Sequence, residues 1–284
     1  MTWPELALAA LVALALAGSW YRYSISTGAV PKVLELYLWL TPILTFTALR
    51  LLHARAGLQG LFPIAVVHLA IVAWALWTVH PSSRRGVTPW LDGVLLVVGA
   101  AVVWLGAITF AGMELRVIAA HREDHLFTVG GFLVGALLSQ AGFAALSAHL
   151  RERGEILLSQ LGLLALIIGT VCWILHLAFR ATVMLAAAQE SAEPTWYPPL
   201  RLWAGAMYAA YMVLAYVSIA FYGAAMQKTG LAGKGWGRTF VAFGLIAATG
   251  FVAQGWWDVP LAVQFMPYAM GMILLRGATV RASN

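Results

Sequence analysis

Three residues that could do chemistry recur at intervals of four in the apolar stretch 155–183. Cys172, His176 and Arg180 therefore share one face if this stretch is a helix. Arg180 carries a permanent positive charge, and His176 is a hydrogen-bond donor whose protonation can change. A charge so close to apolar surroundings needs a counter-charge, so this face predicts a site for an anionic headgroup or a carboxylate. The structural alternative is that Arg180 anchors the helix at the headgroups and His176 bonds to a carbonyl.

A second stripe of polar residues lies in the apolar stretch 199–226. Steps of three or four place on one face Arg201, Ala204, Tyr208, Tyr211, Ala215, Ser218 and Tyr222. In lipid each hydroxyl needs a partner, so this face is expected to turn toward other helices or a polar cavity.

The two stripes are expected to meet, because consecutive spanning helices run in opposite directions and the end of one lies beside the start of the next. The predicted ligand-binding site therefore combines His176 and Arg180 with Tyr208 and Tyr211. Interhelical hydrogen bonding without a ligand is the alternative for the tyrosines.

Histidines inside the apolar stretches suggest a cofactor. His68 lies about ten residues into the stretch 58–79, on the order of 15 Å along a spanning helix. Together with His176 it could supply the axial ligands of a b-type haem, or flank a quinone, in a redox membrane subunit. A neutral His68 bonded to a neighbouring helix is the alternative.

His121 and His125 lie four residues apart and would be adjacent on a helix. Two imidazoles do not complete a metal site, so a zinc ion would need a third ligand. The candidates are Asp124, Asp258, Glu190 and His53. Such a centre would make the protein a metal-dependent membrane hydrolase. The alternative is a solvated charged loop, because mixed charges are typical of loops and helix ends.

The composition indicates that membrane-spanning helices position all of these residues. The chain has 284 residues, of which 62% are hydrophobic and 10% charged, against roughly a quarter charged in a soluble domain. Its one cysteine, Cys172, excludes an intrachain disulfide and a thiolate metal cluster. A spanning helix needs about 20 apolar residues. The expected spans cover 5–22, 33–52, 58–79, 89–112, 127–149, 155–183, 199–226, 238–256 and 260–276.

The expected fold is all-α, a polytopic integral membrane bundle of nine transmembrane helices, with eight as the alternative count because the last hairpin is short. The connections leave no room for a separate soluble domain, so 1–284 is expected to form one transmembrane domain. Glycines at heptad spacing, Gly99 with Gly106 and Gly135 with Gly142, predict close contacts between helices.

The basic residues predict the orientation of the bundle. With the N-terminus outside, eleven of the 17 Lys and Arg residues fall on the inner side and six on the outer side. The C-terminus is then cytoplasmic, and a bacterial cytoplasmic (inner) membrane is the expected location. Because the cations are scattered in ones and twos, no nucleic acid is expected as a partner. The expected partners are the lipid bilayer, a small amphipathic or anionic ligand and subunits of a membrane complex.

Motifs of several enzyme classes are missing from the sequence, which has no Walker loop, no dinucleotide glycine fingerprint and no Gly-x-Ser-x-Gly elbow. Whether the protein is an enzyme stays open at this point. The sequence favours a transporter or binding protein for a small amphipathic or anionic molecule, with a site in the outer half of the bundle. The haem or quinone subunit and the zinc hydrolase are the two alternatives.

Overall fold

The structure is a computed structural model, and it describes residues 90–110, 112–190, 192–254 and 260–283, with isolated positions before residue 90. Within these ranges every regular element is a helix, and no strand is present. In chain order the elements are α4 (Trp90–Ile108), α5 (Leu115–Ala120), α6 (Arg122–Glu152), α7 (Leu157–Phe179), the π-helix η2 (Arg180–Met184), α8 (Leu185–Ala187), α9 (Tyr197–Lys228), α10 (Lys234–Gln254) and α11 (Pro260–Ser283).

Five of these helical segments are long and apolar enough to cross a membrane. They are α4, α6, the continuous run of α7, η2 and α8, then α9 and α10. Helix α11 has a shorter apolar part, Val263–Leu275. The described part of the chain is therefore an apolar helical bundle of a membrane protein. The expected spans 5–22, 33–52 and 58–79 lie outside the described residues, so the count of nine and the orientation stay predictions.

The helix boundaries follow local chemistry. Helix α6 begins at Arg122, five residues before the expected start at 127, and the segment from Arg122 to His125 is its first turn and not a loop. Glu123 and Asp124 lie in that turn, where the helix dipole favours negative charge. Helix α9 begins with proline at its first positions, where the missing N–H costs no helical hydrogen bond.

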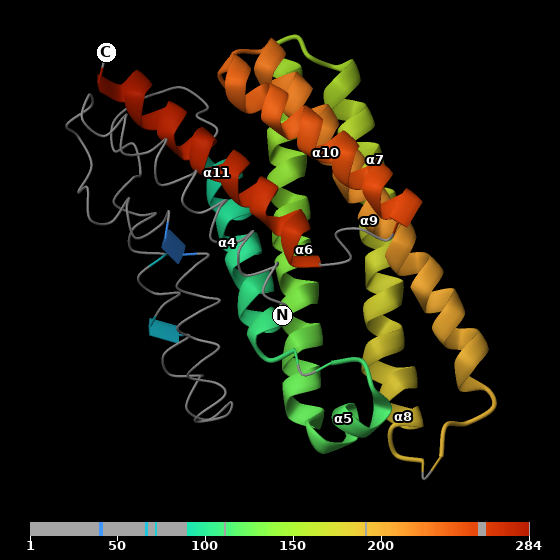
Figure 1. The fold of residues 1–284 in the computed structure, drawn as a ribbon. Helices are drawn as coiled ribbons and strands as arrows, with labels where there is room; N and C mark the ends of the chain where they lie inside the picture. Colours follow the sequence, from blue (N-terminus) through green and yellow to red (C-terminus); the bar gives the residue numbers. More distant parts are fainter. Residues whose placement is uncertain are drawn as a thin grey trace.

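Helices α4 and α6 lie side by side (Figure 1), and glycines line their contact. A Cβ atom added at Gly99 would lie 2.5 Å from Ser139 Oγ and 2.9 Å from the carbonyl oxygen of Gly135. One added at Gly106 would lie 3.0 Å from Gly131 Cα. Because no side chain fits at these distances, the predicted close packing at the heptad glycines is confirmed.

The described bundle has two chemically different ends. Figure 1 shows α5 and α8 together at one end, which also holds η2 and which we call the Arg180 end. The opposite end carries the connections 153–156 and 229–233, and we call it the Glu155 end. Gly154 and Gly230 in these connections have φ of 84° and 71°, which favours glycine over other residues. Helices α7 and α9 pack along each other between the two ends.

Candidate functional site

His176 joins α7 to α9 at the Arg180 end. Its Nδ1–H donates a hydrogen bond to the carbonyl oxygen of Ala204, with an N···O distance of 3.0 Å. Because a carbonyl oxygen only accepts, this bond places a proton on Nδ1. The ring stacks on Trp173, with centroids 5.4 Å apart, and lies 5.2 Å from the ring of Tyr208. The structure therefore brings together His176 and Tyr208, as the two stripes predict.

Arg180 begins the π-helix η2, directly after α7. Such wide turns interrupt the regular α-helical hydrogen bonds and are frequent at functional sites. The backbone carbonyl oxygen of Arg180 accepts a hydrogen bond from His125 Nε2–H at 3.0 Å. This contact fixes the start of α6 against η2, and it uses the backbone of Arg180 while leaving its side chain uncommitted.

The Arg180 side chain is 3% exposed and lies between aromatic rings. Its Cζ atom is 5.2 Å from the ring centroid of Phe110 and 6.0 Å from that of Phe132. Tyr208 is close enough to interact with the guanidinium electrostatically. Phe110 follows the end of α4, which is pinned to α6 by a 2.8 Å hydrogen bond between the hydroxyls of Thr109 and Thr128.

Two nitrogen atoms of this guanidinium, Nε and Nη2, are buried and have no hydrogen-bond partner. Two acidic residues at the same end of the bundle have other partners. Asp124 lies 3.5 Å from His121, and Glu114 lies 2.7 Å from Arg116. Among the described residues no carboxylate forms an ion pair with Arg180. Arg180 is thus a buried cation whose counter-charge the described chain does not provide.

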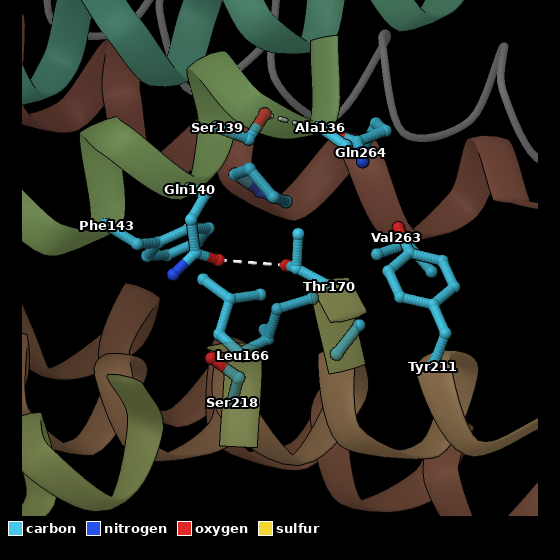
Figure 2. Close-up of a pocket in the computed structure, with 13 residues that line it drawn as sticks. Ala136, Ser139, Gln140, Phe143, Leu166, Thr170, Tyr211, Ser218, Val263 and Gln264 are labelled. Carbon is cyan, nitrogen blue, oxygen red and sulfur yellow. Dashed lines mark hydrogen bonds between the residues drawn. The ribbon is translucent and has the colours of Figure 1, made fainter. Parts of the chain in front are cut away.

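Tyr211 lies one step further into the bundle. Its ring stacks on Trp173, with centroids 4.6 Å apart, so it reaches His176 only through that tryptophan. Its hydroxyl end lies beside Gln264, close enough for a side-chain hydrogen bond. Figure 2 shows the Tyr211 ring rising from α9 toward Val263 and Gln264, at a small cavity between helices.

The cavity beside Tyr211 is small, and its lining combines polar groups with apolar side chains. Hydroxyl and amide groups from four helices line it, and Figure 2 shows two hydrogen bonds among them. Thr170 donates to Gln140 at 2.9 Å, and Ser139 donates to Gln264 at 3.4 Å. The free space is about 20 Å³, roughly what a single buried water needs. This cavity is therefore too small for an organic ligand.

The rest of the hydroxyl stripe on α9 faces the bundle interior. Ser218 donates to the carbonyl oxygen of Gly162 at 2.9 Å, and Tyr222 donates to that of Phe143 at 3.1 Å. Both side chains are fully buried, and Tyr211 is nearly so. The prediction that the stripe avoids lipid is confirmed for these residues. Ser218 and Tyr222 have the interhelical role, since each joins α9 to another helix.

The expected metal pair does not converge in the structure. His121 is exposed at the start of α6 and lies beside Asp124, whereas His125 is buried and donates to Arg180. In the described ranges no group of three or more potential ligands gathers. His53 and Asp258 lie outside those ranges, as does His68, the expected haem partner of His176. The haem, quinone and zinc hypotheses therefore stay predictions.

The aromatic residues of the site were not singled out from the sequence. Trp173 contacts both His176 and Tyr211, and Phe110 and Phe132 flank Arg180. One signal was present: Trp173 precedes His176 by three residues, which places it on the same helix face. Phe132 and His125, seven residues apart on α6, share a face by the same rule.

A second buried charge lies at the Glu155 end. The Glu155 carboxylate is 5% exposed, and its Oε2 lies 2.6 Å from Lys228 Nζ. Its Oε1 accepts a hydrogen bond from the N–H of Leu158 at 3.2 Å, in the first turn of α7. The hydrogen bond from Lys228 holds the pKa of the Glu155 carboxyl below its ordinary value. This contact ties the start of α7 to the end of α9.

Comparison with family models, with curated proteins and with solved structures finds no match to this chain. The chemistry of the site must therefore come from its own geometry.

Proposed function

We propose that the protein binds a small amphipathic or anionic molecule in the outer half of its membrane bundle, as a transporter or a binding protein, and that Arg180 holds the anion. The buried Arg180 guanidinium with two unpartnered nitrogens carries this proposal. The basic-residue count assigns the Arg180 end to the outside.

The energetics of Arg180 support a bound anion. A charged side chain inside a membrane bundle is costly unless it is paired, and such residues usually mark a substrate or ion site. The rings of Phe110 and Phe132 offset part of the cost through cation–π contacts, each about 0.5–2 kcal/mol. They cannot satisfy the two buried N–H groups, each of which costs about 1–3 kcal/mol without an acceptor. An anion would supply both the acceptors and the counter-charge.

His176 and Tyr208 border the proposed site. His176 directs its Nδ1–H to Ala204, so it supports the packing of α7 against α9. Tyr208 is partly buried and offers a hydroxyl close to the guanidinium. Because Arg180 is 3% exposed, ligand exchange requires a local opening at this end of the bundle.

A thermal shift experiment on the full chain in dodecyl maltoside micelles tests the proposal. A ligand that binds the folded state raises the melting temperature, and the shift grows with ligand concentration. We expect octanoate to stabilise the wild-type protein, octylammonium of the same chain length to have no such effect, and Arg180→Gln to abolish the octanoate shift.

The matched control is Arg201→Gln. Arg201 is an exposed arginine near the same end, and its guanidinium lies over Tyr197 and not over Phe110 or Phe132. It should leave the octanoate shift unchanged. An equal shift in wild type and Arg180→Gln, or equal shifts with the anion and the cation, would exclude Arg180 as the anion-binding residue.

A further inference from the structure

The unpartnered nitrogens of Arg180 are a specific pair. In a guanidinium, the Nε–H and one Nη2–H point in the same direction and form the side-on edge of the planar group. These are the two atoms that lack hydrogen-bond partners in the structure. Arginine uses two parallel N–H groups to bind two oxygens of one carboxylate or phosphate. One complete bidentate edge of the Arg180 guanidinium is therefore without a hydrogen-bond partner in the structure.

The surroundings limit how much negative charge this edge can hold. The nearest imidazoles each direct one N–H to the backbone, because His125 Nε2–H bonds to the carbonyl of Arg180 and His176 Nδ1–H to that of Ala204. Within the described ranges no second arginine or lysine forms a cation–π contact with the rings that flank Arg180. A phosphate monoester near pH 7 carries about 1.5–2 negative charges and three strong acceptor oxygens. The two N–H groups and single positive charge of one guanidinium edge neither neutralise this charge nor satisfy three acceptor oxygens.

The faces of the guanidinium favour an apolar neighbour on the ligand. Phe110 and Phe132 flank Arg180, and a buried apolar cluster at the same end includes Phe179, directly before η2, and Met184, the last residue of η2. A chain or ring attached to the anion would meet hydrocarbon here and not water.

We infer that the ligand of the Arg180 site is a monocarboxylate with an apolar tail, bound side-on through Nε and Nη2. This inference rests on the proposed function and names the chemical class of its ligand. Two kinds of molecule have this chemistry: a fatty acid that enters from the bilayer, and a soluble carboxylate that enters from the outer aqueous phase.

Three octyl anions separate the charge of the headgroup from its shape. Isothermal titration of the full chain in dodecyl maltoside would compare octanoate with octyl sulfonate and octyl phosphate. We expect octanoate to bind at least about tenfold more tightly than either of the others. Octyl phosphate or sulfonate binding as tightly as octanoate would overturn the inference while leaving the proposed anion site intact. This comparison uses only the wild-type protein, so it does not depend on the folding of a variant.

Arg180→Lys then tests the bidentate edge, since lysine keeps the charge but lacks the planar fork. We expect octanoate affinity to fall about tenfold or more, with octyl phosphate affinity changed by less than about threefold. Arg201→Lys is the matched control and should change neither. Unchanged octanoate binding in Arg180→Lys would overturn side-on binding. Failure of all three anions to bind the wild-type protein would overturn the proposed function itself.

The source of the carboxylate is distinguished by two further probes. Hexanoate added from solution tests a soluble ligand, and oleate placed in phosphatidylcholine nanodiscs tests a lipid ligand. Arg180-dependent binding of either supports a carboxylate site and identifies its source. Binding of neither, beside Arg180-dependent binding of octyl phosphate, would contradict the inference.

Discussion

The two ends of the α7 and α9 pair each bury a charged side chain, but they satisfy it differently. At the Glu155 end the carboxylate accepts from Lys228 and from the N–H of Leu158. At the Arg180 end the guanidinium is equally buried, yet its Nε and Nη2 have no acceptor. Among the described residues the Glu155 pair is complete, whereas the Arg180 guanidinium has no acceptor.

This difference supports the proposed role of Arg180 as an anion-binding residue. A buried charge that serves structure is usually paired and hydrogen-bonded, as Glu155 is. Asp92, whose Oδ2 also lacks a partner, lies in the first turn of α4, where the helix dipole stabilises a negative charge. Arg180 follows the last turn of α7 and directs its side chain into aromatic surroundings. Within the part of the chain that the structure describes, no acceptor reaches its open edge, which the proposed anion would satisfy.

The largest expected effect concerns which end faces outward. In a Cys172→Ala background, Gln189→Cys near the Arg180 end should be labelled by a membrane-impermeant maleimide in intact cells, and Lys234→Cys near the Glu155 end should not. The eleven-to-six distribution of basic residues sets this expectation. Labelling of opened cells controls for accessibility of both positions. Ready labelling of position 234 in intact cells would reverse the orientation and place the Arg180 site on the inner side.

The second effect tests the pairing at the Glu155 end. Lys228→Met leaves a 5% exposed carboxylate without its cation, which should destabilise the protein by about 1–3 kcal/mol. Glu155→Gln should cost less, about 0.2–1 kcal/mol, because Lys228 is 69% exposed and returns to water. Thermal melting of the purified variants measures both.

The double variant Glu155→Gln with Lys228→Met is the control for this asymmetry. It removes the stranded carboxylate, so its melting temperature should lie above that of Lys228→Met alone. A double variant less stable than either single change would show that the two residues do not act through their mutual contact.

The third effect applies the same kind of substitution to the other end. Arg180→Met also exchanges a cation for methionine, but it removes a charge that lacks a partner. Replacing a buried charge with an apolar residue is often neutral or stabilising. Without ligand we therefore expect a free energy of unfolding equal to wild type or higher by up to about 1 kcal/mol, after the loss of cation–π contacts, and hence an equal or higher melting temperature. A melting temperature several degrees below that of wild type would mean that groups of the ligand-free protein already hydrogen-bond to the Arg180 guanidinium.

Much of the described fold could be predicted from the sequence, because apolar runs of membrane length permit only helices. The expected stretch 199–226 corresponds to α9, Tyr197–Lys228. The heptad glycines of α4 and α6 also gave the contact correctly, since small residues let backbones approach. The early start of α6 was missed because its charged first turn resembles a loop, although the helix dipole stabilises that turn.

The site could be predicted only in part. Helical spacing placed His176 near Tyr208, because consecutive helices meet at their shared end. The π-helix at Arg180 has no sequence signal in the spacing of apolar residues, so the contact of its carbonyl with His125 could not be foreseen. For the same reason the four-residue spacing predicts that His125 pairs with the exposed His121, whereas His125 lies in the bundle interior. The rings that flank Arg180 come from other segments, and the spacing of residues along one helix does not predict this tertiary packing.

The smallest expected effect is the pH dependence of the Glu155 end. The hydrogen bond from Lys228 lowers the pKa of Glu155 below its ordinary value of 4.5, so folding favours the ionised form. The pair therefore contributes its full stability above pH 4.5, and the contribution is lost as pH falls through the lower pKa of the folded state. Because Lys228 is largely exposed, solvent screening limits this contribution to about 1 kcal/mol or less. Melting temperatures measured between about pH 6 and pH 3 should fall by a few degrees more in wild type than in Glu155→Gln. Equal losses in the two proteins would show that this pair does not control the acid response, and the contrast between the two ends would then rest on Arg180 alone.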